Sequence, residues 1–191
     1  MIRNTGRIEA QLIAIQGGAS SESVTNTGVI LGDVYLGGSD DAFLGRYGQV
    51  EGTIFAGIGN DRILSGAGDD TVYGDVGNDF VRGNAGDDVQ FGGQGGDTLL
   101  GDDGDDVLSG AGGADLFVFN RHGDDDRITD FTNGQDRIDL SVFRFATFAA
   151  LSALAVDRAG GLLIDLASLR GGTVFVDGFI KANFDAGDVI L

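Results

Sequence analysis

The sequence of 191 residues contains no cysteine, no proline and no tryptophan, and its one histidine is His122. Without cysteine the chain has neither disulfide bonds nor thiolate metal ligands. The lack of proline suits stacked strands, because proline cannot donate a backbone hydrogen bond to a neighbouring strand. One histidine cannot form a His-Glu-x-x-His zinc site, and the sequence has no Gly-x-Ser-x-Gly motif either. We therefore expect a protein that is not an enzyme.

Basic residues are also scarce, with 12 Lys and Arg against 30 Asp and Glu and a formal net charge of −18. This balance argues against nucleic acids and anionic membranes as partners. Of the acidic residues, 27 are Asp and only 3 are Glu. A surface that merely keeps a protein soluble would use both types, so the bias indicates short carboxylate ligands in turns. The apolar run at residues 12–15 is too short for a signal peptide or a membrane span.

One nine-residue pattern fills residues 56–118 and repeats seven times without a change of phase. Glycine always occupies the fourth place and aspartate the sixth, and the eighth place is apolar with one exception. The fourth-place glycines are Gly59, Gly68, Gly77, Gly86, Gly95, Gly104 and Gly113. The sixth-place aspartates are Asp61, Asp70, Asp79, Asp88, Asp97, Asp106 and Asp115. The eighth-place residues are Ile63, Val72, Val81, Gln90, Leu99, Leu108 and Phe117.

A nine-residue unit is too short to close one coil, so we expect two repeats per coil, each with a turn of about six residues and a strand of about three. The eighth-place side chains then point inward, alternating between two sheets. Turns of repeats n and n+2 stack at the strand spacing of ~4.7–4.9 Å, and calcium–oxygen bonds are ~2.3–2.6 Å long. An ion between two stacked turns is thus at bonding distance from both. The sequence predicts a calcium-binding parallel β-solenoid.

Sites are expected between repeats 1 and 3, 3 and 5, 5 and 7, 2 and 4, and 4 and 6. These five sites would bring ten positive charges and lower the formal charge from −18 to about −8. The core is thin and the turns are rich in carboxylates, so we expect folding and calcium binding to be coupled. An antiparallel meander with Asp-Gly turns and a disordered acidic linker are alternatives, and disorder is the expectation for the metal-free chain.

The first 55 residues contain a longer period. Segments 6–13, 28–35 and 48–55 share the pattern Gly-x-Ile/Val-x-small-x-apolar-apolar, with starts 22 and 20 residues apart. Asn-Thr precedes two of the copies. Alternating apolar places indicate strands, so the period predicts three β-helix coils that lead into the repeats. Asp41, in a degraded nonapeptide with Ser39 in the glycine place, is a candidate for a partial sixth site.

After Val118 the repeats stop. Short strands are expected at 127–131 and 137–140 around the turn Asn133-Gly134, with further strands at 162–164, 173–176 and 189–191. Residues 147–154 are expected to form a short helix with Thr147 as its N-cap. The sequence thus predicts an all-β protein of three parts: N-terminal β-helix coils (1–55), a calcium-binding β-roll (56–118) and a non-repetitive C-terminal β cap (119–191).

The repeats, together with a downstream motif, resemble RTX proteins, in particular the C-terminal part of serralysin-type metalloproteases and related secreted lipases. The motif comprises Ile128, Asp130, Phe131, Gly134, Asp136, Ile138, Asp139, Leu140 and Ser141. The resemblance covers roughly residues 56–191. It implies a parallel β-roll, calcium-dependent folding and export by a type I secretion apparatus that reads an uncleaved C-terminal signal. The ending Asp188-Val189-Ile190-Leu191 is similar to that of the family.

The resemblance also implies which residues hold calcium. The ligands would be the seven sixth-place carboxylates together with backbone carbonyl groups of the turns. The implied carbonyl positions are Gly57, Gly59, Gly66, Gly68, Asp75, Gly77, Asn84, Gly86, Gly93, Gly95, Asp102 and Gly104. Asp75, Asn84, Asp102 and Ala111 depart from the usual second-place glycine, and Gln90 departs from the apolar eighth place.

The leading hypothesis is a secreted, non-enzymatic calcium-binding protein located outside the cell or at its surface. One alternative is a C-terminal folding and export module of a larger secreted protease or lipase. Another is a calcium-dependent adhesin or matrix protein that self-associates or binds surface glycans.

Overall fold

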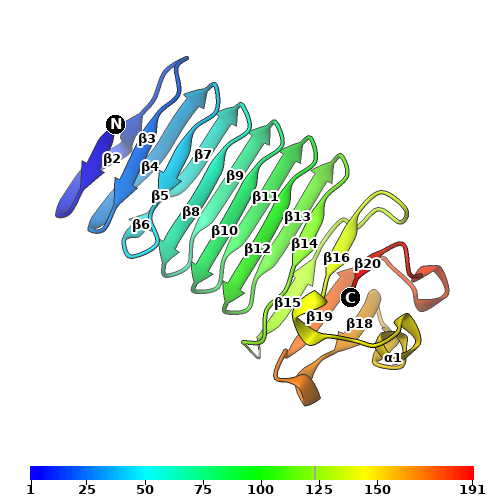
Figure 1. Ribbon diagram of the computed structural model, residues 1–191. Helices are drawn as coiled ribbons and strands as arrows, with labels where there is room; N and C mark the ends of the chain where they lie inside the picture. Colours follow the sequence, from blue (N-terminus) through cyan, green and yellow to red (C-terminus); the bar gives the residue numbers. More distant parts are fainter. Residues whose placement is uncertain (123) are drawn as a thin grey trace.

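The computed structural model describes residues 1–122 and 124–191. The chain winds into a flattened parallel β-solenoid whose strands alternate between two sheets, with a cap at the C-terminal end (Figure 1). The first sheet contains, in order, β1 (Ile2–Asn4), β3 (Ser23–Asn26), β5 (Ala42–Leu44), β8 (Arg62–Ala67), β10 (Phe80–Ala85), β12 (Thr98–Asp103), β14 (Leu116–Val118), β16 (Arg137–Asp139) and β20 (Val189–Ile190).

The second sheet begins at its N-terminal end with β2 (Arg7–Gln16) and β4 (Val29–Gly38), and β6 (Gln49–Glu51) pairs with β4. It continues with β7 (Thr53–Ile58), β9 (Thr71–Val76), β11 (Val89–Gln94), β13 (Val107–Gly112), β15 (Asp125–Ile128), β19 (Thr173–Asp177), β18 (Gly161–Asp165) and β17 (Ala155–Arg158). The predicted all-β parallel solenoid is confirmed.

The expected strand length is wrong. Strands of the repeats, such as β10 and β12, span six residues rather than three, and the turn proper is only places four to six. Pairing runs from Phe80↔Thr98 to Arg82↔Leu100, omits the first place, and resumes at Asn84↔Asp102. The backbone bends at the second place, where Asn84 has a φ of +80°, yet it returns to the ladder afterwards.

The eighth-place side chains form the core between the sheets, as predicted. All seven are completely buried, with Ile63, Val81, Leu99 and Phe117 on the first sheet and Val72, Gln90 and Leu108 on the second. Gln90 donates from Nε2 to the carbonyl oxygen of Leu100 on the facing sheet, at 2.8 Å, and its Oε1 has no partner.

The three N-terminal copies stack as coils, and copies two and three keep the predicted register, with Ile30↔Val50 and Val34↔Ile54. Copy one keeps it only through Ile8↔Ile30; the register then shifts, so that Ile15 instead of Leu12 lies opposite Val34 and Leu12 is exposed. Their corners are joined by asparagine, because Asn4 Nδ2 donates to Asn26 Oδ1 at 2.9 Å and both side chains are buried. Parallel pairing of β4 with β7 and of β5 with β8 continues these coils directly into the repeats.

The C-terminal residues cover the end of the solenoid. Strands β15, β16, β19 and β20 extend the parallel sheets, whereas β17, β18 and β19 form an antiparallel meander. The predicted helix is shorter than expected: α1 covers Phe148–Ser152, with Thr147 Oγ1 accepting from the Ala150 amide. The sequence also failed to indicate β17, the shift of the first cap strand to β15, and three 3-10 helices (Ser141–Phe143, Ala167–Leu169 and Lys181–Asn183).

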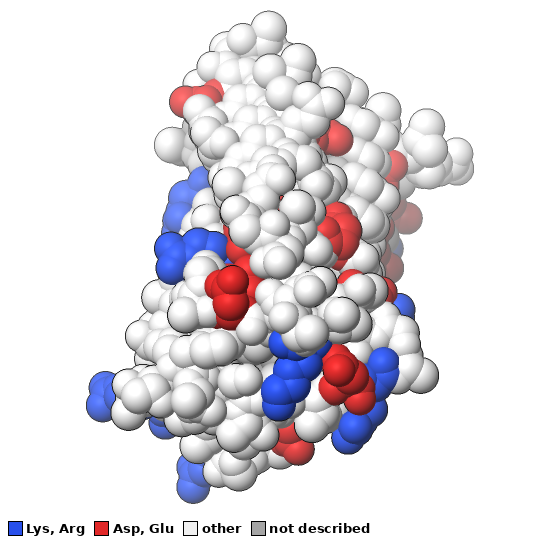
Figure 2. Space-filling view, turned by 90° about the vertical axis from the view of Figure 1, so that its right-hand side faces the viewer, with Lys and Arg blue, Asp and Glu red and all other residues white. Residues whose placement is uncertain are grey.

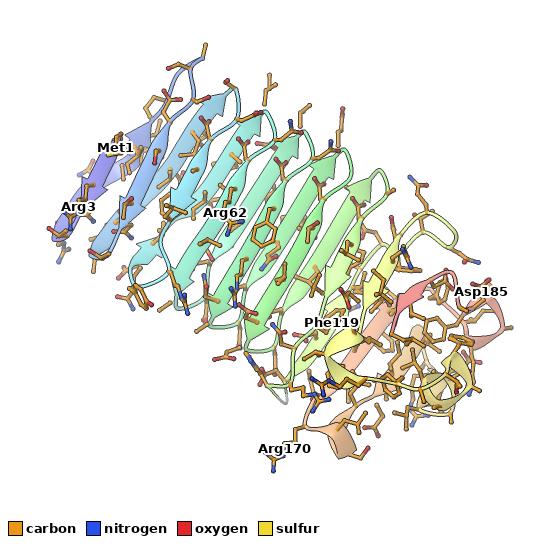
Figure 3. All side chains as sticks on the ribbon, viewed as in Figure 1. Met1, Arg3, Arg62, Phe119, Arg170 and Asp185 are labelled. Carbon is orange, nitrogen blue, oxygen red and sulfur yellow. The ribbon has the colours of Figure 1, made fainter. Side chains whose placement is uncertain are left out.

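A cluster of phenylalanines forms the interior of the cap. Phe131 and Phe179 meet edge to face at 5.1 Å between ring centroids, and Phe184 contacts Phe179 in the same way at 6.4 Å. Phe119, at the junction of roll and cap, is also buried (Figure 3). No helix among residues 1–122 and 124–191 is long and apolar enough to cross a membrane.

The inward position of Leu99 gives a direct test of the core. Leu99→Ala should destabilise the calcium-saturated protein by about 2–5 kcal/mol, because it leaves a cavity between the sheets. The adjacent Leu100 faces outward and is half-buried, so Leu100→Ala should cost about 1 kcal/mol or less. Urea unfolding followed by circular dichroism measures both, and equal losses would contradict the inward assignment of the eighth place.

Candidate metal centre

The turns of the repeats gather on the two edges of the solenoid. Turns that lead from the second sheet into the first form the first edge, with Asp61, Asp79, Asp97 and Asp115. Turns that lead from the first sheet into the second form the second edge, with Asp70, Asp88 and Asp106. The predicted stacking of repeats n and n+2 is therefore present on both edges.

Hydrogen bonds connect the sixth-place aspartates along each edge. Asp79 Oδ1 accepts from the Asp61 amide at 2.7 Å, and Asp88 Oδ1 accepts from the Asp70 amide at 2.8 Å. The same bond recurs at Asp97, Asp106 and Asp115, with lengths of 2.8, 2.8 and 2.9 Å. These five carboxylates thus reach back to the preceding turn and leave their second oxygen for another partner, whereas Asp70 accepts no such bond from the described residues.

Those second oxygens have no partner. Within the described residues, a buried Oδ2 without a hydrogen bond occurs at Asp41, Asp61, Asp70, Asp79, Asp88, Asp97, Asp106 and Asp115. These aspartates are at most 4% exposed. A buried carboxylate oxygen with neither a donor nor a cation costs considerable free energy, so such oxygens are rare in isolation. Eight of them in two rows fit a divalent cation that prefers oxygen ligands.

In repeats 3 to 7, glycine at the first place makes room for the sixth-place carboxylate. A Cβ built on Gly74 would lie 2.6 Å from Asp79 Oδ2 and 2.5 Å from the Gly92 carbonyl oxygen. At the other first-place glycines a Cβ would come nearer still to the sixth-place Oδ2 of its own repeat; these are Gly83, Gly92, Gly101 and Gly110. The sequence shows these residues to be small, but their contact with the carboxylate emerges only from the fold.

The first two repeats lack this glycine, with Ala56 and Ser65 at the first place. Ser65 is completely buried, and its Oγ donates to the Gly83 carbonyl oxygen of the next coil at 2.9 Å. The Ser65 hydroxyl also lies beside the Asp70 carboxylate and lowers the Asp70 pKa, although burial has the larger, opposite effect.

The fourth-place glycines need their conformation and their lack of a side chain. Gly77 has a φ of +142°, and a Cβ there would overlap the carbonyl oxygen of Gly59 in the preceding turn. The same overlap recurs along both edges, so the fourth-place carbonyl oxygens point along the stack toward the next turn. Their role as backbone ligands stays a prediction.

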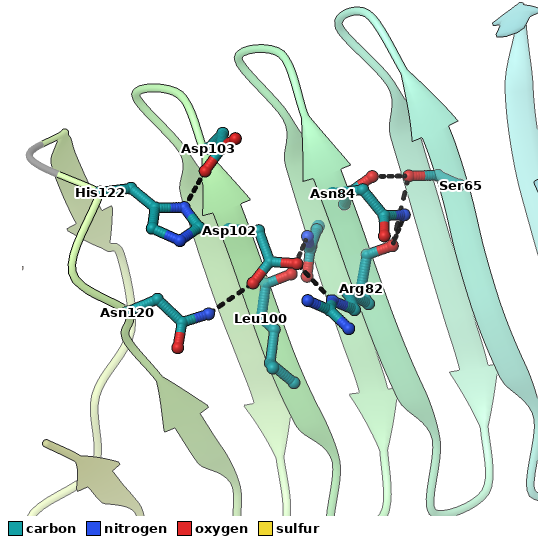
Figure 4. Close-up of polar contacts among 10 residues, drawn as sticks. Ser65, Arg82, Asn84, Leu100, Asp102, Asp103, Asn120 and His122 are labelled. Carbon is teal, nitrogen blue, oxygen red and sulfur yellow. Dashed lines mark hydrogen bonds and ion pairs between the residues drawn. The ribbon is translucent and has the colours of Figure 1, made fainter. Parts of the chain in front are cut away.

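The second-place residues also adopt positive φ. Gly57, Gly66 and Gly93 do so as glycines, and Asp75, Asn84, Asp102 and Ala111 do so with φ between +63° and +80°. The substitutions therefore preserve the bend of the strand at the second place. The Asp102 carboxylate pairs with Arg82 and Asn120 on the face of the first sheet (Figure 4).

Three further aspartates extend the rows beyond the repeats. On the first edge, Asp61 Oδ1 accepts from the Asp41 amide at 2.7 Å, and Asp136 Oδ1 accepts from the Asp115 amide at 3.0 Å. On the second edge, Asp126 Oδ1 accepts from the Asp106 amide at 3.1 Å. Asp136 follows Gly134 at the repeat spacing and was detectable from the sequence. The sequence indicated only that the run Asp124-Asp125-Asp126 could lend an oxygen to the last site, because residue 124, two places before Asp126, is not glycine.

His122 lies apart from the carboxylate rows. Its Nδ1 pairs with Asp103 (Figure 4). Asp103, His122 and Asp124 offer ligand atoms within 4.8 Å of one another. Asp103 and His122 are exposed, unlike the aspartates of the rows. Basic and acidic side chains are interspersed over the face in Figure 2, so the net charge forms no single continuous patch there.

Burial raises the pKa of the row carboxylates. The pKa of Asp88 rises to about 8, mainly through loss of solvent; the Asp70 amide opposes this, and the charges of Asp106 and Asp70 add to it. The pKa values of Asp79 and Asp106 rise to about 7 for the same principal reason, and those of Asp61 and Asp115 to about 6. In the absence of a cation, the fold therefore favours protonated carboxylates.

Comparison with known proteins places these turns in a family. The family model described as RTX calcium-binding nonapeptide repeat (4 copies) matches residues 55–90 and 91–121. These residues are RTX calcium-binding repeats, and calcium is the ion that the two rows imply.

One similar solved structure is the solution structure of the AlgE6R3 subunit from the Azotobacter vinelandii mannuronan C5-epimerase. It is 28% identical, with 69% of this chain and 77% of that chain covered and a TM-score of 0.37. No curated protein matches the chain.

The raised pKa values predict an unusual pH dependence for the metal-free protein. A folded-state pKa of 6–8 against 3.8 means that the fold retains protons which the unfolded chain releases. Stability from these groups is complete below about pH 4 and is lost as the pH rises through 6 to 8. In EGTA, β-type circular dichroism should be stronger at pH 5 than at pH 8; a signal that strengthens toward pH 8 would contradict this.

The first-place glycines give a second test. Gly101→Ala should displace the Asp106 carboxylate, lower calcium affinity and destabilise the loaded protein by about 1–3 kcal/mol. Gly112→Ala is the matched control, since the nearest atom to a Cβ there lies at 3.8 Å. Calcium titration and thermal unfolding of both variants measure the effect, and equal behaviour would refute a special role for the first place.

Proposed function

We propose that this chain is a secreted, non-enzymatic protein that folds when it binds about five calcium ions within its RTX repeats. The observation that carries the proposal is the double row of buried Oδ2 atoms without partners. The sixth-place carboxylates and the carbonyl groups of the turns would hold the ions. Bound calcium supplies positive charge that neutralises the carboxylates and joins successive coils.

The number of ions follows from the stacking within the repeats. On the first edge, the stacked turns of repeats 1, 3, 5 and 7 leave three spaces between neighbouring turns, and each space could hold one ion. On the second edge, the turns of repeats 2, 4 and 6 leave two such spaces. Asp41, Asp126 and Asp136 each flank one more space of this kind, at the ends of the repeats. We propose that the five spaces between stacked turns of the repeats are the principal calcium sites.

Coupling of folding to calcium supports an extracellular location. The metal-free chain carries a charge of −18 and would lose little by remaining unfolded where calcium is scarce. Extracellular calcium modules bind with Kd values of ~10⁻⁴–10⁻³ M, which matches calcium-rich surroundings. We therefore propose folding after export, with the cell exterior or cell surface as the destination.

Export by a type I apparatus is proposed from the C-terminal residues 188–191. In the folded protein Val189 and Ile190 pair with Ile138 and Asp139 in the first sheet, and Asp188 is 1% exposed. Asp188 and Val189 are thus accessible only before the cap forms, whereas Leu191 stays exposed. This accords with passage of an unfolded chain.

A second candidate function is that of a calcium-dependent adhesin or matrix protein. It is favoured by four aromatic rings, Tyr35, Phe55, Tyr73 and Phe91, stacked on the second sheet with centroid separations of 4.6, 5.2 and 4.6 Å. Calcium-dependent sedimentation and glycan-array binding test it. The alternative of a module within a larger secreted enzyme is tested by the reading frame upstream of Met1.

The proposal predicts a metal-driven transition. In EGTA at pH 8 the chain should give a coil-like circular dichroism spectrum, and calcium should convert it to a β spectrum. Calorimetric titration should give a stoichiometry of about five. Magnesium at equal concentration is the control, because it demands a tighter octahedral site and retains its water. A spectrum that is indifferent to calcium would show the proposal to be wrong.

A further inference from the structure

The fifth place of each repeat forms a second ladder beside the aspartate rows. On the second edge, the Asp87 amide donates to Asp69 Oδ1 and the Asp105 amide donates to Asp87 Oδ1, both at 2.9 Å. Asp125 continues this ladder, again at 2.9 Å. In these bonds the amide of the later turn donates to the carboxylate of the earlier turn. In the sixth-place bonds the earlier turn donates to the later one.

The equivalent ladder on the first edge is neutral within the repeats. The Asn78 amide donates to Asn60 Oδ1 at 2.8 Å, and the Gly96 amide donates to Asn78 Oδ1 at 2.6 Å. Gly96 and Ala114 then carry no side-chain oxygen. Asp40 precedes Asn60 in the same ladder, so the first edge carries a fifth-place charge only before the first repeat.

The two ladders have one geometry and different charges. Asparagine and aspartate both present Oδ1 to the next turn, so the hydrogen bond does not distinguish them. Each second-edge turn in the repeats therefore has two adjacent carboxylates, at the fifth and sixth places, whereas each first-edge turn has one. On the first edge, Asp75 of the second place adds a charge near Asp61 and Asp79. All the fifth-place side chains of the ladders are exposed, namely Asn60, Asp69, Asn78, Asp87, Asp105 and Asp125.

This difference acts directly on a bound cation. The affinity of calcium sites increases with the number of charged groups around the ion. A second carboxylate beside the ligand adds attraction that falls with distance and with salt, because the fifth-place groups face solvent. In the metal-free chain the same pairs repel each other.

We infer that the two edges are unequal: the second edge binds calcium more tightly, fills first and depends more on ionic strength, and the first edge fills at higher calcium concentration. The inference rests on the proposed calcium binding. The doubled carboxylates of the second edge, and not the sixth-place aspartates common to both, set the order.

Nuclear magnetic resonance of the full chain tests the order of filling. The amides of Gly86 and Gly104 report on the second edge, and those of Gly77 and Gly95 on the first. At substoichiometric calcium, the Gly86 and Gly104 signals should reach their bound positions first. Simultaneous change on both edges, or earlier change at Gly77 and Gly95, would overturn the inference.

Two substitutions that change charge but not shape test whether the fifth-place carboxylates cause this order of filling. Asp87→Asn should weaken the tighter phase of a calorimetric titration by roughly fivefold, and Asn78→Asp should strengthen the weaker phase by a similar factor. The double variant retains the net charge of −18 and should bring the two phases closer together. These differences should shrink at 0.5 M salt, where screening is stronger.

Each outcome has a distinct meaning. If the wild-type chain binds no calcium, the proposed function fails; if it binds calcium but both variants leave the two phases unchanged, only the inequality of the edges fails. Calcium-saturated circular dichroism confirms that the variants fold. Asp69→Asn and Asn60→Asp provide the same comparison one coil earlier should either variant not fold.

Discussion

The whole solenoid depends on carboxylates that are stacked at the spacing of a parallel sheet and buried with one oxygen unpaired. The spacing is imposed by the strands, and the burial by the turns that lie across the edges. Neither can relax without breaking the ladder of backbone hydrogen bonds. The unpaired oxygens therefore require a proton or a cation, and at neutral pH the cation is the better solution.

Glycine determines where this arrangement can form. The fourth-place glycine lets a carbonyl group of one turn approach the backbone of the next, as at Gly77 above Gly59. The first-place glycine serves the carboxylate instead, since Asp79 lies where a side chain of residue 74 would be. Because each short repeat places only one side chain between the sheets, the core is small. Little apolar surface is therefore buried to hold the metal-free chain together.

Much of this could be predicted from the sequence because the repeat is strict. A glycine, an aspartate and an apolar residue at constant spacing define the coil, the edges and the inward side chains, as Gly95, Asp97 and Leu99 illustrate. The strands are longer than predicted because backbone pairing resumes after the second-place residue with positive φ. Nothing in the residue types of the repeat indicates this return to the sheet. The run Asp124-Asp125-Asp126 could be read from the sequence either as a solvated turn or as an oxygen donor to the last site, and only the pairing of β13 with β15 places Asp126 in the row. The cap lacks a repeat, so β17 and the short helices depend on tertiary packing around Phe131 and Phe179.

The winding of two repeats per coil also limits how such a rod can lengthen or shorten. Equivalent turns on one edge are 18 residues apart. Adding or deleting 18 residues leaves every later strand in its own sheet and the cap unchanged. Loss of a single nonapeptide would exchange the two sheets for everything downstream, so that the terminal strands β19 and β20 would meet the wrong neighbours. Changes in the length of this rod are therefore expected in whole coils of two repeats. The cap can pair correctly with the solenoid only if the number of repeats changes by an even number.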